Sequence, residues 1–563
     1  MREMIRWKKY VMYNMAFLIP FLFIFFNTFT WNSDRAFKCV VSSILFSLVF
    51  SLMSRGVREI ILPVLCGVLF YIATAGTFYW YFTSQNAGWC EVHYELFFAE
   101  SLSCILILLT RLLADRIRLI TIIEIPIIII SSIYILYYII FDVSINSDTY
   151  FIIFQTNASE VMKFLWDYKI ACILFLIFSV FISREVYRYN SSINFTEKRF
   201  HLIIPFVFLL GIVLINIKLV LLDSHLYIQR DFNIAYGYMQ QSKNLSENMK
   251  DIGVVKSNSN IRNIVVVIGE SANRDFMGAY GYERDNTPWM SKMSKMPNVV
   301  LFDKCYTSYR LTNKALAYML TEKSQYNDED VFSALNIVDV FKAAGFKTYW
   351  ISDQGNISNF REIYNVIAQR ADVAKFIEHG GDADLIDLLD IIDKDDKKVI
   401  FVHLQGSHHP YHNYPSEYQL YKNDSVNDRY DNTILYTDFI LSEMYAKLKK
   451  INPDVFIYIS DHGESKEMMR NIFNFRLSHV PFMMIFSVGF IENNTELYEQ
   501  ALQKRHTYFT HDMFYDTMLG MTGVDKQFYD DSANLFSPHY AYDKDNLKTE
   551  YGDVYIKDDP YDE

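Results

Sequence analysis

Two segments of the sequence place side chains of metal-ligand type directly after a run of apolar residues. The segment 263–271 reads NIVVVIGES and contains Glu270, and the segment 455–465 reads VFIYISDHGES and contains Asp461 and His462. Carboxylate oxygens and an imidazole nitrogen are a ligand set that suits zinc. The two segments together predict a metal site. Two simpler interpretations remain open: Glu270 as a carboxylate at a helix N-terminus, and Asp461–His462 as a hydrogen-bonded loop pair.

Two further segments offer nucleophiles and histidines. Residues 305–320, CYTSYRLTNKALAYML, are rich in hydroxyl groups and lead into an apolar, helix-like run. Residues 403–415, HLQGSHHPYHNYP, follow another apolar run. We expect one or two histidines of this second segment to face the site and the rest to be exposed; they are His403, His408, His409 and His412.

Short apolar runs from Arg262 onward predict the element that brings these segments together. Candidate strands are Ile264–Ile268, Lys347–Ile351, Lys398–His403, Val455–Ile459 and Phe482–Phe486, with helical patterns between them at Val331–Ala344 and Thr433–Lys449. β-Branched runs flanked by helices are typical of a mostly parallel sheet covered on both faces. In such sheets ligands bind beyond the carboxyl ends of the strands, where Glu270 and Asp461 would lie.

The first 222 residues have a different composition. Apolar stretches long enough, or nearly so, to cross a hydrocarbon core of roughly 30 Å lie near 11–30, 38–54, 60–82, 98–113, 119–142, 169–183 and 202–222. Basic residues collect before the first stretch and after the second, fourth and sixth, which places the N-terminus in the cytoplasm. We therefore expect an odd number of spans, five to seven, and a multi-pass protein whose remaining residues lie outside the membrane.

The rest of the chain divides further by composition. Residues 223–260 are predicted to be a connector helix and linker, residues 261–540 a catalytic domain, and residues 541–563 an acidic, solvated and partly disordered tail. The net charge of −12 argues against nucleic-acid binding. Cys305 is the single cysteine after residue 222, so this part has no internal disulfide.

At these residues the sequence resembles the phosphoethanolamine transferases of Gram-negative inner membranes, members of the alkaline phosphatase and sulfatase superfamily. The similar blocks are VVVIGESANRDFMGAYGYERDNTP, GFKTYWISDQ, HLQGSHHPY, YDNTILYTDFIL and YISDHGES, in the order of the family. The resemblance implies a sulfatase-like α/β domain behind a bundle of transmembrane helices, with the domain in the periplasm.

The resemblance also implies roles for individual residues. Thr312 takes the position of the nucleophile, with Thr307 and Ser308 as local competitors. One zinc would be held by Glu270, Thr312, Asp461 and His462. His408 would contact the substrate phosphate or a second zinc, and His479 is a weaker candidate for a substrate-binding histidine. The chain departs from the family pattern T-x-x-S-x-P-C-M at Ala315, Ala317 and Tyr318 and lacks the disulfides of the lipid A-modifying branch.

The implied reaction transfers phosphoethanolamine from phosphatidylethanolamine through a covalent intermediate on Thr312, with release of diacylglycerol. The acceptor would be lipid A, the lipopolysaccharide core or another envelope glycan, and the protein is expected to be monomeric. One alternative is a phosphoglycerol transferase of the same superfamily that uses phosphatidylglycerol. Another is a membrane scaffold without catalytic activity. A sulfatase is disfavoured because no C/S-x-P-x-R motif occurs.

Overall fold

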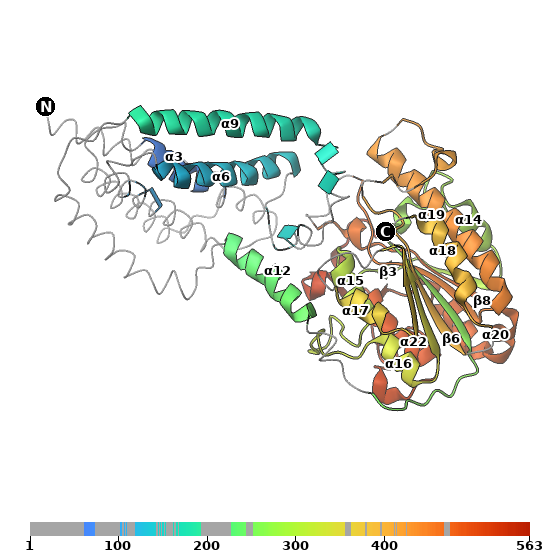
Figure 1. Ribbon diagram of the computed structural model, residues 1–563. Helices are drawn as coiled ribbons and strands as arrows, with labels where there is room; N and C mark the ends of the chain where they lie inside the picture. The colour runs from blue at the N-terminus through green and yellow to red at the C-terminus, as the bar shows by residue number, and fades with distance from the viewer. Residues whose placement is uncertain are drawn as a thin grey trace. The chain divides into compact units, whose positions relative to one another are not determined.

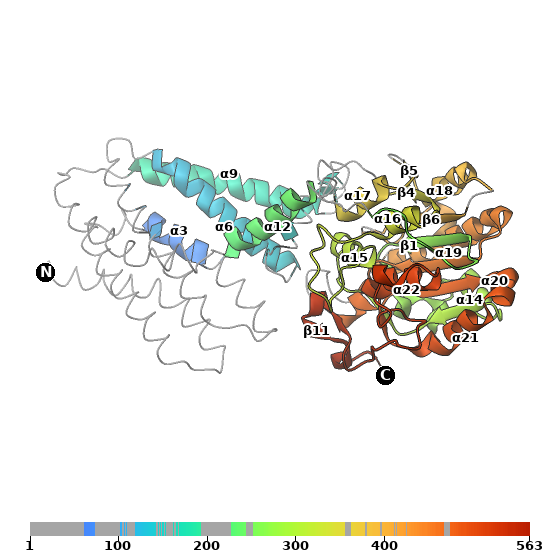
Figure 2. The same cartoon turned by 90° about the horizontal axis from the view of Figure 1, so that it is seen from below.

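The structure is a computed structural model (Figures 1 and 2). It describes residues 252–562 except 355–361, 378–379, 395–396, 410, 413, 424 and 467–472. Of the first 251 residues it describes mainly Ile61–Tyr71, Thr121–Phe141, Lys169–Ser192 and Tyr227–Lys243. The chain divides into two compact units, Met1–Tyr236 and Gly237–Glu563.

The second unit is built on a seven-stranded sheet with the order β2-β8-β7-β1-β6-β4-β5. Strands β7, β1, β6, β4 and β5 run parallel to one another, whereas β8 is antiparallel to β7 and β2 is antiparallel to β8. Their bounds are β1 Asn263–Gly269, β2 Val299–Phe302, β4 Lys347–Ser352, β5 Val373–Phe376, β6 Lys398–His403, β7 Val455–Ser460 and β8 Phe482–Phe486. Two short pairs, β3 Cys305–Tyr306 with β9 Phe509–Thr510 and β10 Lys548–Thr549 with β11 Val554–Tyr555, lie outside this sheet.

Helices cover both faces of the sheet because successive strand side chains point to opposite sides. Ile264, Val266 and Ile268 of β1 belong to one apolar cluster, and Val265 and Val267 belong to the other. The first cluster includes residues of α15 Thr312–Met319, α16 Ile337–Ala343, α17 Ile363–Gln369 and α22 Phe514–Met521. The second includes residues of α14 Pro288–Met293, α18 Asp382–Leu388 and α19 Val426–Leu448 (Figure 1). Two further helices, α20 Val488–Asn493 and α21 Thr495–Gln503, follow β8.

The predicted sheet is confirmed. It is a mixed sheet, with parallel and antiparallel strands, in an α/β domain. Strands occur at all five predicted places. Strands β2 and β5 were not predicted, and neither was the antiparallel direction of β8 relative to β7. Helix α19 begins seven residues before the predicted start at Thr433, because Ser425 caps its N-terminus by accepting a hydrogen bond from the backbone N–H of Asp428.

The prediction of a solvated, partly disordered tail is wrong. Residues 541–562 fold against the domain, with Leu547 and Ile556 fully buried. Strands β10 and β11 pair as an antiparallel ribbon. Part of the acidic charge that suggested solvation is paired within the domain: Asp562 forms an ion pair with Lys544 at 2.6 Å and also accepts a hydrogen bond from the hydroxyl of Tyr508 at 2.5 Å.

The described residues of the first unit form apolar helices. Helix α3 (Ile61–Tyr71), α6 (Thr121–Phe141) and α9 (Lys169–Ser192) share a small buried cluster that includes Cys66, Ile128 and Val186. Among the residues that were described, α9 is the one helix long and apolar enough to cross a membrane. The predicted spans near 11–30, 38–54 and 202–222 lie outside the described residues, as do parts of those near 60–82 and 98–113. Helix α12 (Tyr227–Lys243) falls within the predicted connector.

Candidate active site

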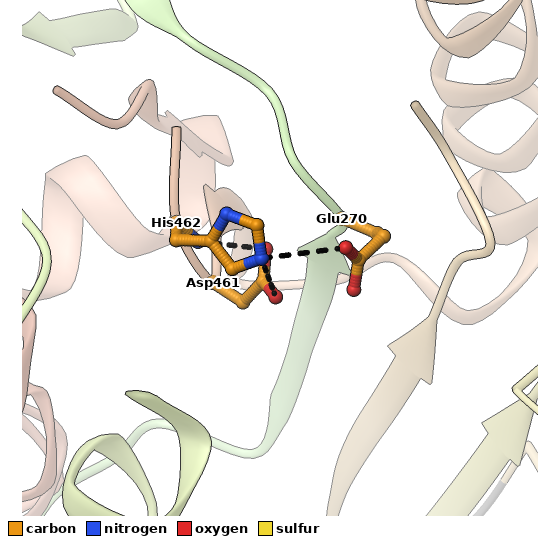
Figure 3. A group of neighbouring side chains, drawn as sticks. All are labelled: Glu270, Asp461 and His462. Atoms are coloured by element: carbon orange, nitrogen blue, oxygen red, sulfur yellow. Dashed lines mark hydrogen bonds and ion pairs between the residues drawn. The ribbon is translucent and has the colours of Figure 1, made fainter. Parts of the chain in front are cut away.

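Glu270, Asp461 and His462 meet because β1 and β7 are neighbouring parallel strands. Gly269 pairs with Ser460 across the two strands, so the residue that follows each strand leaves the sheet at the same edge. His462 Nε2 lies 3.5 Å from Glu270 Oε1 and 3.4 Å from Asp461 Oδ2 (Figure 3). All three side chains are buried, and one ligand atom from each lies within 4.8 Å of the others. The predicted carboxylate–imidazole cluster is therefore present.

Thr312 joins this cluster as the first residue of α15. Its Oγ1 donates a hydrogen bond to Glu270 Oε2 at 2.9 Å and lies 3.3 Å from His462 Nε2. The two competing hydroxyls, those of Thr307 and Ser308, are fully buried. Thr307 Oγ1 also lies 2.7 Å from the carbonyl oxygen of Asp461 and 2.6 Å from His511 Nε2. Of the three hydroxyls, that of Thr312 combines contact with the cluster and access to solvent.

Backbone groups orient the acidic and imidazole ligand atoms. His462 Nδ1 lies 2.7 Å from the carbonyl oxygen of Gly463 and must be the donor there, so Nε2 presents its lone pair to the cluster. The N–H groups of Ser271 and His462 donate to Asp461 Oδ1 at 2.9 and 2.7 Å. Ser271 has a φ of 58°, in the left-handed region, so the chain turns sharply after β1.

The electrostatics of the cluster favour a bound cation. Burial, and after it the negative charge of Glu270, raise the pKa of Asp461 above its usual range. Asp461 Oδ2 is buried and accepts no hydrogen bond from the described residues. A cation would relieve the repulsion between the two carboxylates and satisfy this oxygen. One nitrogen, two carboxylates and a hydroxyl fit the donor set of zinc.

Gln354 is a site residue that the sequence analysis did not single out. It follows β4, and its Nε2 donates to Glu270 Oε2 at 2.9 Å and to the carbonyl oxygen of Leu404 at 3.0 Å. It thereby fixes the carboxylate that also accepts from Thr312. The available signal was its position two residues beyond a third parallel strand, in the block that ends SDQ.

The histidines of 403–415 have separate surroundings. His403 is fully buried between Trp350 and Tyr364, with ring centroids 6.3 and 5.4 Å away. His408 is half-buried and its Nδ1 lies 2.7 Å from the carbonyl oxygen of His409. His409 and His412 are exposed. Among these four histidines, His408 is therefore the one that is partly exposed and also adjacent to Gly406–Ser407, whose backbone packs on Glu270.

The structure gives His479 partners other than the cluster. Its Nδ1 lies 2.6 Å from Asp275 Oδ2, and its Nε2 lies 2.6 Å from Asp559 Oδ2. The ring is almost fully buried and packs edge-on against Tyr306. His479 is held by two carboxylates on either side, one of which belongs to the segment predicted to be a disordered tail.

Comparison with known proteins identifies the domain. Residues 262–524 match the sequence model of the sulfatases. This segment is a sulfatase-family domain. The phosphoethanolamine transferase EptC of Escherichia coli K12 is 23% identical over 463 residues, which cover 72% of this chain and 80% of EptC. The phosphoethanolamine transferase OpgE of the same organism is 31% identical over 250 residues, 40% of this chain and 45% of OpgE. The resemblance to phosphoethanolamine transferases is confirmed.

Solved structures agree on the fold. The integral membrane protein lipooligosaccharide phosphoethanolamine transferase A from Neisseria meningitidis is similar with a TM-score of 0.58 and 19% identity. The match covers 86% of this chain and 98% of that one. The C-terminal periplasmic domain of EptC from Escherichia coli is similar with a TM-score of 0.50 and 21% identity, over 56% of this chain and 98% of that domain. The sulfatase-family domain thus has the fold of these two proteins.

Proposed function

We propose that this protein is a membrane-anchored transferase that moves phosphoethanolamine from phosphatidylethanolamine to an acceptor in the cell envelope, with release of diacylglycerol. The observation that carries the proposal is the hydroxyl of Thr312 against Glu270 and His462, at 2.9 and 3.3 Å, within a sulfatase-family domain. The names of the similar proteins, phosphoethanolamine transferases, supply the transferred group.

Glu270, Asp461 and His462, with Thr312, would hold one zinc ion. A zinc ion bound there would act as a Lewis acid, lowering the pKa of the Thr312 hydroxyl and neutralising charge on the phosphoryl oxygens. Gln354 and the backbone N–H groups of Ser271 and His462 keep these ligand atoms in place. The orphaned Asp461 Oδ2 supports this assignment.

The residues of the chain carry out a double displacement. Thr312 Oγ1, oriented by Glu270 Oε2, attacks the phosphorus of phosphatidylethanolamine, and the bond between phosphorus and the glycerol oxygen breaks. The proton that Thr312 loses is transferred to that oxygen, which leaves as diacylglycerol; His408 is the candidate to relay it. In the second step an acceptor oxygen attacks the phosphorus of the phosphoethanolamine–Thr312 ester. The bond to Thr312 Oγ1 breaks, and the proton lost by the acceptor restores the threonine hydroxyl.

A lipid donor accounts for the apolar first unit. Leu176 and Val180 of α9 are each 64% exposed, as expected for a helix whose apolar side chains face lipid. We propose an odd number of spans, with residues 1–222 as the transmembrane domain, residues 223–260 as the connector and the catalytic domain in the periplasm. Lipopolysaccharide, lipid A or another surface glycan would supply the acceptor oxygen.

The donor headgroup distinguishes this proposal from a phosphoglycerol transferase. Full-length protein in detergent micelles would be supplied with either phosphatidylethanolamine or phosphatidylglycerol, and diacylglycerol release measured with zinc present. We expect release from phosphatidylethanolamine, and none with Thr312→Ala. Release from phosphatidylglycerol alone would instead identify the phosphoglycerol transferase, and release from neither would favour a non-catalytic scaffold.

A further inference from the structure

The folded segment 548–562 contacts the loop that carries Thr312. We propose that this segment, which we call the 548–562 strap, positions Thr312 for the reaction, and that Tyr551 is its main positioning residue. The inference rests on the proposed function, because it takes Thr312 as the nucleophile. It concerns residues that touch neither the cluster of Glu270, Asp461 and His462 nor, on the proposed mechanism, the substrate.

Hydrogen bonds from the strap reach the chain on both sides of Thr312. Thr549 Oγ1 donates to the carbonyl oxygen of Thr307 at 2.8 Å. The backbone N–H of Tyr551 donates to the carbonyl oxygen of Ser308 at 3.1 Å. The hydroxyl of Tyr551 donates to the carbonyl oxygen of Lys314 at 2.9 Å. The strap therefore holds the loop before Thr312 and the first turn of α15 after it.

Ring packing and an ion pair reinforce these bonds. The ring of Tyr551 stacks on that of Tyr318, with centroids 4.1 Å apart and an interplanar angle of 13°. It also packs against Tyr309, with centroids 4.6 Å apart. Glu550 forms an ion pair with Arg310, and the two side chains are 8% and 6% exposed. Such a buried, paired charge tolerates little displacement of either segment.

The strap adopts a strained backbone at the point of contact. Glu550 and Tyr551 have φ values of 52° and 58°, in the left-handed region that residues other than glycine disfavour. Two such residues in succession persist only where surrounding contacts hold them, and such strain clusters at functional sites. Here the contacts that hold the turn include those made with the loop before Thr312 and with α15.

Both sides of the strained turn are anchored to the domain. On one side, the carbonyl oxygen of Lys548 accepts from Gln325 Nε2 at 2.8 Å. On the other, Asp559 is buried, accepts from the hydroxyl of Tyr306 at 2.9 Å and contacts His479. The pairing of His479 with Asp559 gives this histidine a role in holding the strap.

The loop before Thr312 also contacts the segment that carries Asp461 and His462. The hydroxyl of Thr307 lies 2.7 Å from the carbonyl oxygen of Asp461, while the carbonyl oxygen of Thr307 accepts from Thr549. The loop before Thr312 thus lies between the strap and the segment that contributes Asp461. Displacement of the strap would move Thr312 relative to Glu270 and His462, while the three ligands Glu270, Asp461 and His462 would stay in place.

The test compares variants of the full-length protein in detergent micelles that contain phosphatidylethanolamine. Tyr551→Ala removes the ring and the hydroxyl, and Tyr551→Phe removes the hydroxyl alone. Tyr555→Ala is the matched control, because Tyr555 lies in the same strap, is 40% exposed and has its ring beside Lys548 and Lys557. The readouts are the rate of adduct formation on Thr312 by intact-protein mass spectrometry, amide hydrogen exchange of the peptide 307–319, zinc content and melting temperature.

We expect Tyr551→Ala to slow adduct formation by about tenfold or more, because small misplacements of a reacting group reduce rates steeply. Exchange in the peptide 307–319 should accelerate, while zinc content stays at that of wild type. Tyr551→Phe, which loses one hydrogen bond, should slow the rate by less than about fivefold. Tyr555→Ala should match wild type in rate and exchange.

Wild-type rate and wild-type exchange in Tyr551→Ala would overturn the proposal, as would an equal loss in Tyr555→Ala. If Tyr551→Ala lost zinc and unfolded, Tyr551→Phe would be compared with Tyr555→Ala instead. Faster exchange of the peptide 307–319 in Tyr551→Phe alone would support the positioning role of the strap. Equal exchange in the two variants would overturn the proposal. Failure of the proposed function has a different signature, since wild type would then form no adduct. Exchange of the peptide 307–319 would still show whether the strap holds the loop.

Discussion

Gln354 holds Glu270 in place through an amide that faces two acceptors. Its Nε2 donates to Glu270 Oε2 at 2.9 Å and to the carbonyl oxygen of Leu404 at 3.0 Å, so the amide cannot rotate freely. Side chains that orient a metal ligand contribute to metal affinity although they do not touch the metal. Gln354 therefore belongs to the zinc site proposed above.

Replacing Gln354 by alanine should weaken zinc binding by about 10- to 100-fold, because Glu270 would lose the donor that orients it. Competition with a calibrated zinc chelator would measure the dissociation constant. Gln419→Ala is the matched control, since Gln419 is exposed. Zinc affinity in Gln354→Ala equal to that of Gln419→Ala would show that the contact has no role in metal binding.

At the scale of elements, three parallel strands could be predicted because each is a run of six or seven residues rich in valine and isoleucine. These are β1, β6 and β7, and Glu270 follows the end of β1 while Asp461 and His462 follow the end of β7. β2 and β5 have four residues each, too few to distinguish from loops. The direction of β8 leaves no mark in its composition, because an antiparallel strand buried on both faces is as apolar as a parallel one.

The site could be predicted where its residues follow strands, and less well elsewhere. Glu270, Asp461 and His462 lie directly at strand ends, whereas Thr312 was assigned through the resemblance to a family. Gln354 looks like any polar residue after a strand. The partners of His479 could not be predicted, because Asp559 lies 80 residues further on in a segment whose acidity suggested solvation.

Strand β6 ends in a histidine that the core surrounds. His403 is fully buried, and neither ring nitrogen has a hydrogen-bond partner among the described residues. Burial lowers the pKa of His403 to about 4, against a smaller opposing effect of Glu270. An unfolded histidine titrates near 6.5, so between these values the unfolded chain binds a proton that the folded domain does not. Stability should therefore fall as the pH decreases from about 6.5 to about 4.

His403→Phe should remove this part of the acid sensitivity while keeping an aromatic ring between β4 and α17. Relative to wild type, the variant should gain on the order of 1–3 kcal/mol in unfolding free energy between pH 6.5 and pH 4. Melting temperatures measured across this range with a chelator present would test it, with the exposed His412→Phe as the control. Parallel pH profiles of wild type and His403→Phe would contradict the assignment.

At the scale of the whole molecule, the proposed topology places the two ends of the chain on opposite sides of the membrane. An odd number of spans is predicted from basic residues that cluster before the first apolar stretch and after alternate ones. The donor lipid and the envelope acceptor would then both be accessible to the catalytic domain. The side on which the catalytic domain lies depends on whether the number of spans is odd or even, and not on the number itself.

A thiol reagent that does not cross membranes can test the parity. Val488 is 68% exposed in the catalytic domain, so Val488→Cys should be labelled in intact spheroplasts beyond the level of the parent protein. Lys8→Cys, before the first apolar stretch, should be labelled only after lysis. Labelling of both positions before lysis, or of neither, would require an even number of spans. The reverse pattern would keep an odd number and place the catalytic domain in the cytoplasm.

The central claim is that Thr312 is the nucleophile of a phosphoethanolamine transferase. Intact-protein mass spectrometry of full-length protein purified with phosphatidylethanolamine and zinc tests it most directly, when combined with fragmentation that locates the modified residue. The account predicts one phosphoethanolamine adduct on Thr312 of the wild type and none in Thr312→Ala. A phosphoethanolamine adduct that persists in Thr312→Ala would contradict it.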